Sequence, residues 1–98
     1  MASRTISGTA EELITRSRMR KSWVIQNEDT TINVFIKRER EATPTVSTTD
    51  HDHRIGPGAA MALNFGTDGI EAIQDRWTII AASGTPRISL FETEDTVR

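Results

Sequence analysis

Residues 21–27 read K-S-W-V-I-Q-N, and the interpretation of the whole chain starts from them. A tryptophan, a valine and an isoleucine form a short apolar run between basic residues and the polar cluster N-E-D. Such a run, bounded by turn residues, is typical of a β-strand. Residues 76–82 (R-W-T-I-I-A-A) and 87–92 (R-I-S-L-F-E) have the same character. We therefore predict that 21–27 is a central strand and that the two later stretches are its partners.

Two further stretches alternate along the chain, as strands with one buried face do. In residues 30–37 three β-branched residues share one face, and Phe35 lies on the other, which predicts that this second face is also covered. Only a short polar cluster separates this stretch from the central strand, so we expect the two to form a hairpin. Residues 59–65 (A-A-M-A-L-N-F) alternate in the same way, with their large side chains on one face.

Short strands at regular spacing, separated by Gly, Pro, Asn and Asp, predict an all-β fold. We expect a small antiparallel β-sandwich or barrel, jelly-roll-like, with a long loop and a flexible N-terminal arm. The predicted core consists of Trp23, Ile25, Ile32, Val34, Ile36, Met61, Leu63, Phe65, Trp77, Ile79, Ile88 and Leu90.

The length of 98 residues predicts one domain. We interpret 1–10 as an N-terminal arm that is mobile or ordered only by a partner, 11–92 as the β domain, and 93–98 as a frayed tail. Within the domain, 38–58 form a long loop that ends in the turn G-P-G and contains a weak strand at 45–48. A loop of this length in a small domain is functional or mobile.

Three short segments complete the prediction. Residues 9–12 (T-A-E-E) match a capping box and predict the start of a helix. The β-branched pair at 14–15 instead favours a first edge strand within 11–20, and we prefer the strand. Residues 70–73 are interpreted as another brief strand, and 83–86 (S-G-T-P) as a hairpin turn.

Composition excludes several classes of protein. There is no cysteine, so disulfides and thiolate metal sites are excluded. No apolar run approaches the roughly 20 residues of a membrane-spanning helix, and the N-terminus lacks the apolar region of a secretory signal. The net charge is −2, yet basic residues gather near the start and acidic residues near the end. These ends are solvated or pair between copies. The basic candidates for partner binding are Arg4, Arg16, Arg18 and Arg20.

Both histidines lie in the segment Asp50-His51-Asp52-His53. On a strand, the spacing His-x-His puts both imidazoles on one face, where they can bind a metal. The cupin metalloenzymes use such a pair followed by a glutamate, but here R-I-G-P-G follows and no third histidine exists. His51 and His53 are therefore only weak metal candidates. Solvated loop residues are the preferred interpretation, and a contact between subunits is the third.

No pattern predicts catalysis or a cofactor. The chain has no nucleophile elbow, no third group to orient a histidine, and no phosphate-binding loop after G-P-G. Trp23 and Trp77 would form a sugar-stacking platform if exposed, but their place within apolar strands favours the core. The basic residues are too few, and too poor in aromatic neighbours, to indicate nucleic-acid binding. We therefore expect a protein that is not an enzyme.

The order of short motifs along the chain resembles that of a known family. S-G-T-A at 7–10 and R-K-S-W-V-I-Q-N at 20–27 are followed by a second strand and a long loop that closes on I-G-P-G at 55–58. R-W-T-I-I-A-A-S-G at 76–84 and a last strand ending in Glu92 come later. This order resembles the small β-sandwich proteins of tailed-phage virions, of the head decoration (cement) or head-fibre type. The resemblance covers most of residues 7–92, and the charged part of the long loop, 38–54, departs from it.

The resemblance implies a structural protein without catalysis that decorates or cements the capsid between subunits of the major capsid protein. It implies many copies, as a homotrimer, on the capsid surface of a virion made in the host cytoplasm. It implies no cofactor, nucleic acid or membrane. The basic N-terminal segment and the long loop would then bind the capsid protein. The alternative is a receptor- or carbohydrate-binding module of a fibre or tail, which an exposed Trp23 or Trp77 would favour.

Overall fold

The computed structural model describes residues 2–18, 20–39, 43–64 and 70–94. These form strands and one short helix, and no helix among them is long and apolar enough to cross a membrane. The elements are β1 (Ala2–Thr5), β2 (Glu11–Ile14), β3 (Arg20–Asn27), β4 (Val34–Arg38), β5 (His53–Ile55), β6 (Ala60–Asn64), α1 (Ile70–Gln74), β7 (Trp77–Ala81) and β8 (Arg87–Glu94).

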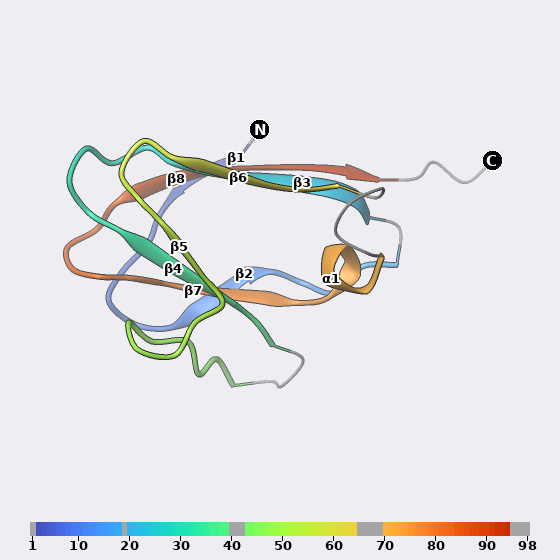
Figure 1. Cartoon of the computed structure of the whole chain (residues 1–98), viewed down its shortest axis with the longest axis horizontal. Helices are drawn as coiled ribbons and strands as arrows, with labels where there is room; N and C mark the ends of the chain where they lie inside the picture. Colours follow the sequence, from blue (N-terminus) through green and yellow to red (C-terminus); the bar gives the residue numbers. More distant parts are fainter. Residues whose placement is uncertain (1, 19, 40–42, 65–69, 95–98) are drawn as a thin grey trace.

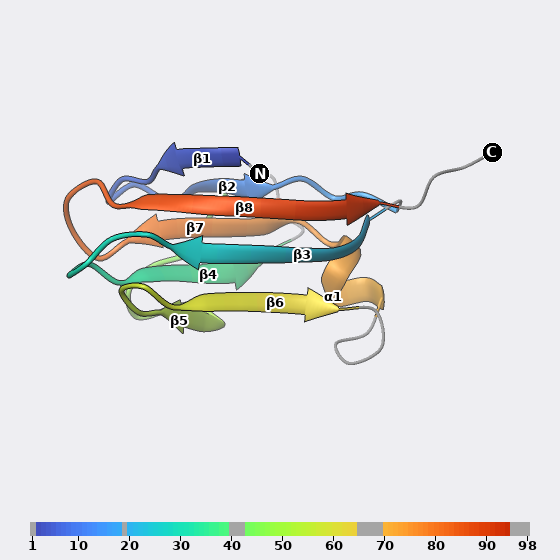
Figure 2. The same cartoon turned by 90° about the horizontal axis from the view of Figure 1, so that it is seen from above.

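The strands form two antiparallel sheets that pack face to face (Figure 1). Sheet A has the order β1-β8-β3-β6, and sheet B has the order β2-β7-β4-β5 (Figure 2). The first strand therefore pairs with the last, the second with the seventh, the third with the sixth, and the fourth with the fifth. This pairing is that of a long hairpin rolled into a sandwich, which is the jelly-roll topology. The predicted all-β sandwich is confirmed.

The predicted hairpin between β3 and β4 is wrong, because the two strands lie in different sheets. The buried side chain of Asn27 holds the corner between them: its Nδ2 donates to the carbonyls of Ile32 (2.7 Å) and Ile55 (3.0 Å). Asp29 then accepts hydrogen bonds from the amides of Thr31 and Ile32. These bonds, Thr31 first, lower the pKa of Asp29. The polar cluster thus directs the chain across the sandwich instead of reversing it within one sheet.

The same correction applies to the expected partners of β3. Strand β8 pairs with it, as predicted, but β7 belongs to sheet B. The segment 83–86 therefore links the two sheets and is not a hairpin turn. Strands β3 and β7 meet instead across the core, where the ring centroids of Trp23 and Trp77 lie 5.3 Å apart in an edge-to-face arrangement. Two similar apolar runs can pair edge to edge or pack face to face, and periodicity does not distinguish these.

The core contains most of the residues that the sequence predicts. Trp23, Ile25, Val34, Ile36, Leu63, Trp77, Ile79 and Ile88 are buried, Met61 and Leu90 are partly buried against them, and Ile32 is half-buried. Phe65 lies outside the described residues. The prediction missed Ile6, Leu13, Ile14, Ile55 and Ile73. Most of the missed residues come from short segments that show too little alternation to reveal a face.

Three local predictions need correction. Residues 2–5, expected in a mobile arm, form the edge strand β1 in register with β8, and Ile6 beyond them is fully buried. The expected brief strand at 70–73 is the helix α1, which places Ile73 in the core. The weak strand of the long loop lies at β5 and not at 45–48. The preferred strand within 11–20 is confirmed for β2.

Candidate interaction surface

The outer face of sheet A carries a neutral surface, which we call the neutral face. Because side chains alternate along a strand and Trp23 and Ile25 point into the core, Val24 points outward. Phe91 of β8 and Ala62 of β6 are in register with Val24 on either side, so an apolar row crosses the sheet. The described residues of the neutral face are Ser3, Thr5, Ser22, Val24, Gln26, Ala60, Ala62, Ser89, Phe91 and Thr93.

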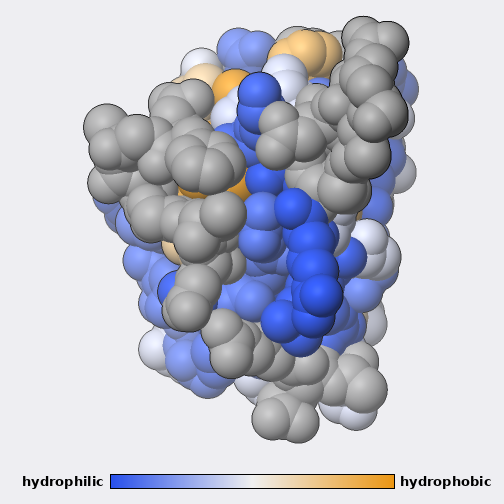
Figure 3. All heavy atoms as spheres, turned by 90° about the vertical axis from the view of Figure 1, so that its right-hand side faces the viewer, coloured by the Kyte–Doolittle hydropathy of each residue, from blue (hydrophilic) through white to orange (hydrophobic). Residues whose placement is uncertain are grey.

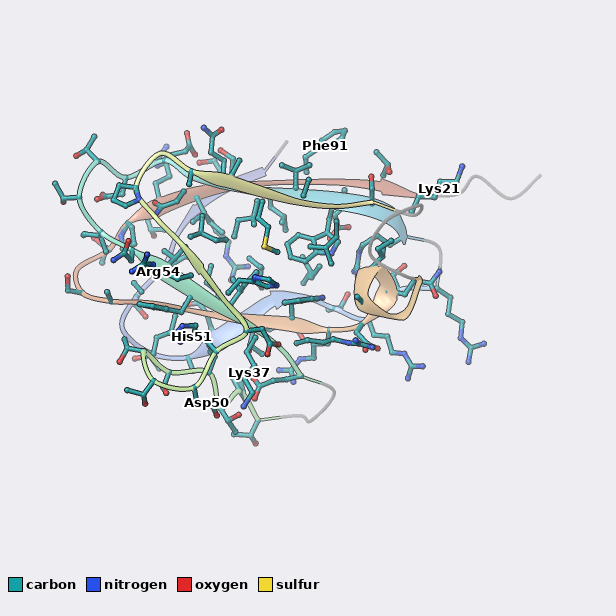
Figure 4. The ribbon with its side chains drawn as sticks, viewed as in Figure 1. Lys21, Lys37, Asp50, His51, Arg54 and Phe91 are labelled. Carbon is teal, nitrogen blue, oxygen red and sulfur yellow. The ribbon has the colours of Figure 1, made fainter. Side chains whose placement is uncertain are left out.

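None of these side chains is charged, in a chain of which 27% of the residues are charged. Arg87 and Glu28 lie at one end of sheet A, and Lys21 lies at the other (Figure 4). The charged residues thus start from the rim, and the Glu28 carboxylate reaches in as far as Ser3 and Ser89, while the row of Val24, Phe91 and Ala62 is neutral. Charge depletion in the centre, with an aromatic residue present and a polar rim, is characteristic of the core of a protein–protein interface.

Phe91 is the most conspicuous residue of the neutral face. Its side chain is 44% exposed, and it is the one exposed large hydrophobic residue among those described. Figure 4 shows it projecting away from the sandwich. In the space-filling view, hydrophobic colour gathers along the upper edge, where sheet A lies, above a hydrophilic end of the molecule (Figure 3).

Several hydroxyl groups of the neutral face already have partners in the chain. Ser22 and Thr93 share a hydrogen bond of 2.6 Å between their hydroxyls. Ser89 and Ser3 both donate to the Glu28 carboxylate. Covering a hydroxyl that keeps its hydrogen bond costs far less than covering one that loses its bonds to water. The apolar row and the Ser22–Thr93 pair can therefore be covered by another protein surface at low cost, whereas Ser3 and Ser89 hold the Glu28 carboxylate at the edge of the neutral face.

The outer face of sheet B differs, because residues 43–52 of the chain lie across it (Figure 1). The ring of His51 lies 4.5 Å from that of Phe35, which is only 8% exposed. Val46 of the same segment is 2% exposed, although it is not part of the core between the sheets. The prediction that the second face of 30–37 is covered is therefore confirmed. We call residues 43–52 the covering segment.

The covering segment is held by polar contacts to β4 and its end. The buried carboxylate of Glu39 accepts hydrogen bonds from the amide (3.0 Å) and hydroxyl of Thr45 and from the hydroxyl of Thr78. Lys37 binds Asp50 at 2.7 Å, and the amide of Arg38 donates to Asp52 at 2.8 Å.

Two pKa shifts follow from these contacts. Burial raises the pKa of Glu39, but the hydrogen bonds from Thr45 and Thr78, together with the charge of Lys37, outweigh it, so the pKa lies below its ordinary value. The hydrogen bond to Asp50 raises the pKa of Lys37. Both shifts favour the charged forms, in which Glu39 and Lys37 make these contacts to the covering segment.

The expectation that both imidazoles share one face is wrong. His53 is in register with Ile36, whose side chain is in the core, and its ring lies 6.3 Å from that of Trp77. His51 precedes β5 and packs on Phe35, on the opposite side of sheet B. The two rings cannot bind one metal ion across the sheet. Among the described residues, no group of three or more His, Cys, Asp or Glu side chains is arranged to hold a metal.

The four basic candidates occupy different environments. Arg20 is 1% exposed, and its guanidinium donates to the carbonyls of Ile73 (2.9 Å), Asp75 (3.2 Å) and Thr15. It thereby satisfies carbonyls at the end of α1, which have no partner within the helix. Arg20 is therefore a structural residue, and its assignment to partner binding is wrong.

The other candidates lie at the surface. Arg4 is half-buried and binds Glu11 at 2.7 Å, so it links the edge strands β1 and β2 of the two sheets. Arg16 and Arg18 are exposed in the connection between β2 and β3, and they remain candidates for partner binding.

A depression of about 560 Å³ opens between β5, β6 and α1. Its apolar lining consists of Met61, Ala62, Leu63, Ala72 and Trp77, and its polar lining of Arg38, Asp52 and His53. Arg38 is bound to Asp75, and Asp52 accepts a hydrogen bond from the Arg38 amide.

Both tryptophans are buried. Trp77 donates its ring N–H to the carbonyl of Ala72 and is 3% exposed, and Trp23 is fully buried. Neither tryptophan can therefore act as an exposed sugar-stacking platform.

Comparison with protein-family models, with curated proteins and with solved structures found no match. The resemblance to phage virion proteins therefore stays a prediction. The sequence already contained a signal for the neutral face: if Trp23 and Ile25 point inward, period two places Val24 and Gln26 outward. The other residues of the neutral face could not be predicted, because they depend on the register of β3 with β6 and β8, which the sequence did not reveal.

Proposed function

We propose that the protein is a non-enzymatic structural protein of a phage virion, which decorates or cements the capsid by binding between subunits of the major capsid protein. The neutral face is the observation that carries this proposal. A protein that works by lying against other proteins needs a surface that can lose its water cheaply, and the neutral face meets this requirement. A catalyst would not need it.

Two further features support the proposal. The jelly-roll topology is common in viral capsid domains, which is an argument by analogy of fold. In addition, the exposed Arg16 and Arg18 offer positive charge at the end of the sandwich away from the β3–β4 corner, suited to acidic patches of a capsid protein. The buried tryptophans remove the feature that would favour a carbohydrate-binding module.

The test is co-sedimentation with expanded capsids assembled from the major capsid protein of the same genome. The wild-type chain should sediment with the capsids at a fixed ratio to the capsid protein. The double variant Arg16→Glu and Arg18→Glu should bind at least about 10-fold more weakly, because it reverses two contact charges. Arg54→Glu, an exposed charge reversal on the outer side of sheet B, serves as the matched control. Absence of wild-type binding would refute the proposal.

A further inference from the structure

We infer that the neutral face is the contact surface for a second copy of this chain, so that two sandwiches pack with their A sheets against each other around a twofold axis. The inference deepens the proposed function, on which it rests only in treating the neutral face as an assembly surface. It names the partner of the neutral face as the chain itself, leaves the exposed Arg16 and Arg18 for the capsid protein, and places the axis near Phe91.

Charge is the first argument for a second copy. In a twofold contact every patch meets a copy of itself or of a neighbour, so a face with charges of one sign near the axis would repel its mate. The row of Val24, Phe91 and Ala62 has no charge at all. The rim has charges of both signs, with Arg87 and Glu28 at one end of the sheet and Lys21 at the other. A copy turned end for end would bring Lys21 of one molecule toward Glu28 of the other.

Shape is the second argument. The apolar row has its one large side chain at one end, since Phe91 stands beside Val24 and the short Ala62 lies beyond Val24. Two sheets that pack face to face lie about 10 Å apart, so a ring that projects from one sheet can reach the facing copy. With the copies turned end for end about an axis along this row, the Phe91 ring of one copy would meet the Phe91 ring of the other, and aromatic pairs pack favourably in offset or edge-to-face arrangements.

The third argument is a comparison with the outer face of sheet B. There the chain covers its outward phenylalanine, Phe35, with its own residues 43–52. Phe91 on sheet A has no such cover among the described residues, and it remains 44% exposed. The comparison shows one outward phenylalanine that is covered and one that no described residue covers, and a second copy would supply that cover.

The area buried between the two copies indicates how tightly they should bind each other. Four strands at about 4.8 Å spacing and three outward rows at about 6.7 Å give a footprint of about 20 Å by 20 Å, or about 800 Å² over two copies before side-chain relief is added. Stable complexes bury about 1,200–2,000 Å². The pair should therefore be weak in dilute solution and form as the concentration rises, as it would on a crowded surface.

Sedimentation velocity of the isolated full chain over about 10 μM to 1 mM tests the inference, a range chosen for a weak interface. The mass should rise from 10.9 kDa toward twice that value, without capsids present. Phe91→Glu should raise the dissociation constant at least about 10-fold, since it buries two like charges near the axis. Ala62→Glu is a second variant at an exposed position of the same row, in case the first fails to fold. Thr48→Glu, exposed in the covering segment, is the matched control and should pair like the wild type.

The absence of cysteine permits a direct test of the axis. Phe91→Cys should be joined into dimers by a short bismaleimide cross-linker, and Thr48→Cys should not. A wild-type chain that stays monomeric, a trimer, or equal cross-linking of the two cysteine variants would overturn the inference. Because these measurements use no capsid, they separate its failure from that of the proposed function: a chain can pair without binding capsids, or bind them while staying monomeric.

Discussion

The two outer faces of the sandwich differ in how an outward phenylalanine is surrounded. Each carries an outward phenylalanine on a central strand of its sheet, Phe91 on β8 and Phe35 on β4. The chain covers Phe35 with residues 43–52, and it leaves Phe91 exposed within a neutral surface. The difference teaches that two outward phenylalanines on central strands can have opposite environments, because the covering segment lies over one face of the sandwich and not over the other.

The largest effect is expected when the same substitution is made on both faces. Phe35→Ser should lower the free energy of unfolding by about 2–4 kcal/mol, because it removes a buried aromatic side chain and leaves a cavity under His51. Phe91→Ser should change it by no more than about 0.5 kcal/mol at concentrations where the chain is monomeric, as at other surface sites. Urea denaturation followed by tryptophan fluorescence measures both. Equal losses would show that the two faces do not differ.

An intermediate effect is expected from acid, and it should be confined to the covered face. The pKa of Glu39 lies below its ordinary value of 4.5, so the folded state favours the carboxylate. Its contribution to stability is therefore present above about pH 4.5 and is lost as the pH falls through the lower pKa of the folded state. The protection of the amides in 43–52, measured as the hydrogen-exchange rate relative to the intrinsic rate at each pH, should fall below that pH, while amides of β3 and β8 stay protected.

Glu39→Gln is the control for this acid response. It should lower the free energy of unfolding by about 1–2 kcal/mol at neutral pH, because the amide group cannot accept all the hydrogen bonds that the carboxylate accepts. It should also flatten the pH dependence of exchange in the covering segment. If the variant responded to acid as the wild type does, Glu39 would not be the group that titrates. Asp29, whose pKa is also lowered, would then be examined by Asp29→Asn.

The smallest effect is expected from Asp50→Asn. Asp50 binds Lys37 at 2.7 Å, but its side chain is 60% exposed. An exposed ion pair contributes little, because water and salt screen it and both side chains lose rotamer freedom. The midpoint of urea denaturation should stay within error of the wild type, at low and at high salt. A clear loss at low salt would show that this pair, and not Glu39, holds the covering segment.

Much of the fold could be predicted from local pattern. The alternation in β3, β6, β7 and β8 is a property of neighbouring residues, and it identified strands and most of their buried side chains. What failed was the assignment of strands to sheets. That depends on the corner at Asn27, whose amide bonds residues five and 28 positions away in sequence. No local pattern reports a partner at such a distance.

The sequence predicted the candidate site less well than it predicted the fold. The basic residues near the start of the chain look alike in sequence, yet Arg20 is buried against carbonyls at the end of α1 while Arg16 and Arg18 are exposed. The two histidines likewise share one short segment but lie on opposite sides of sheet B. Neighbours in sequence separate in space wherever a strand begins between them, as β5 does after His51.

The sequence by itself determined that this protein is an all-β domain with a tryptophan-rich core and no cysteine, because side-chain period and composition are local properties of the chain. Only the tertiary structure decided that the domain is a jelly roll, that residues 43–52 cover one face, and that the other face is neutral. These features depend on the register and order of strands far apart in sequence. Register is fixed by packing and corner hydrogen bonds that form only when the two sheets meet.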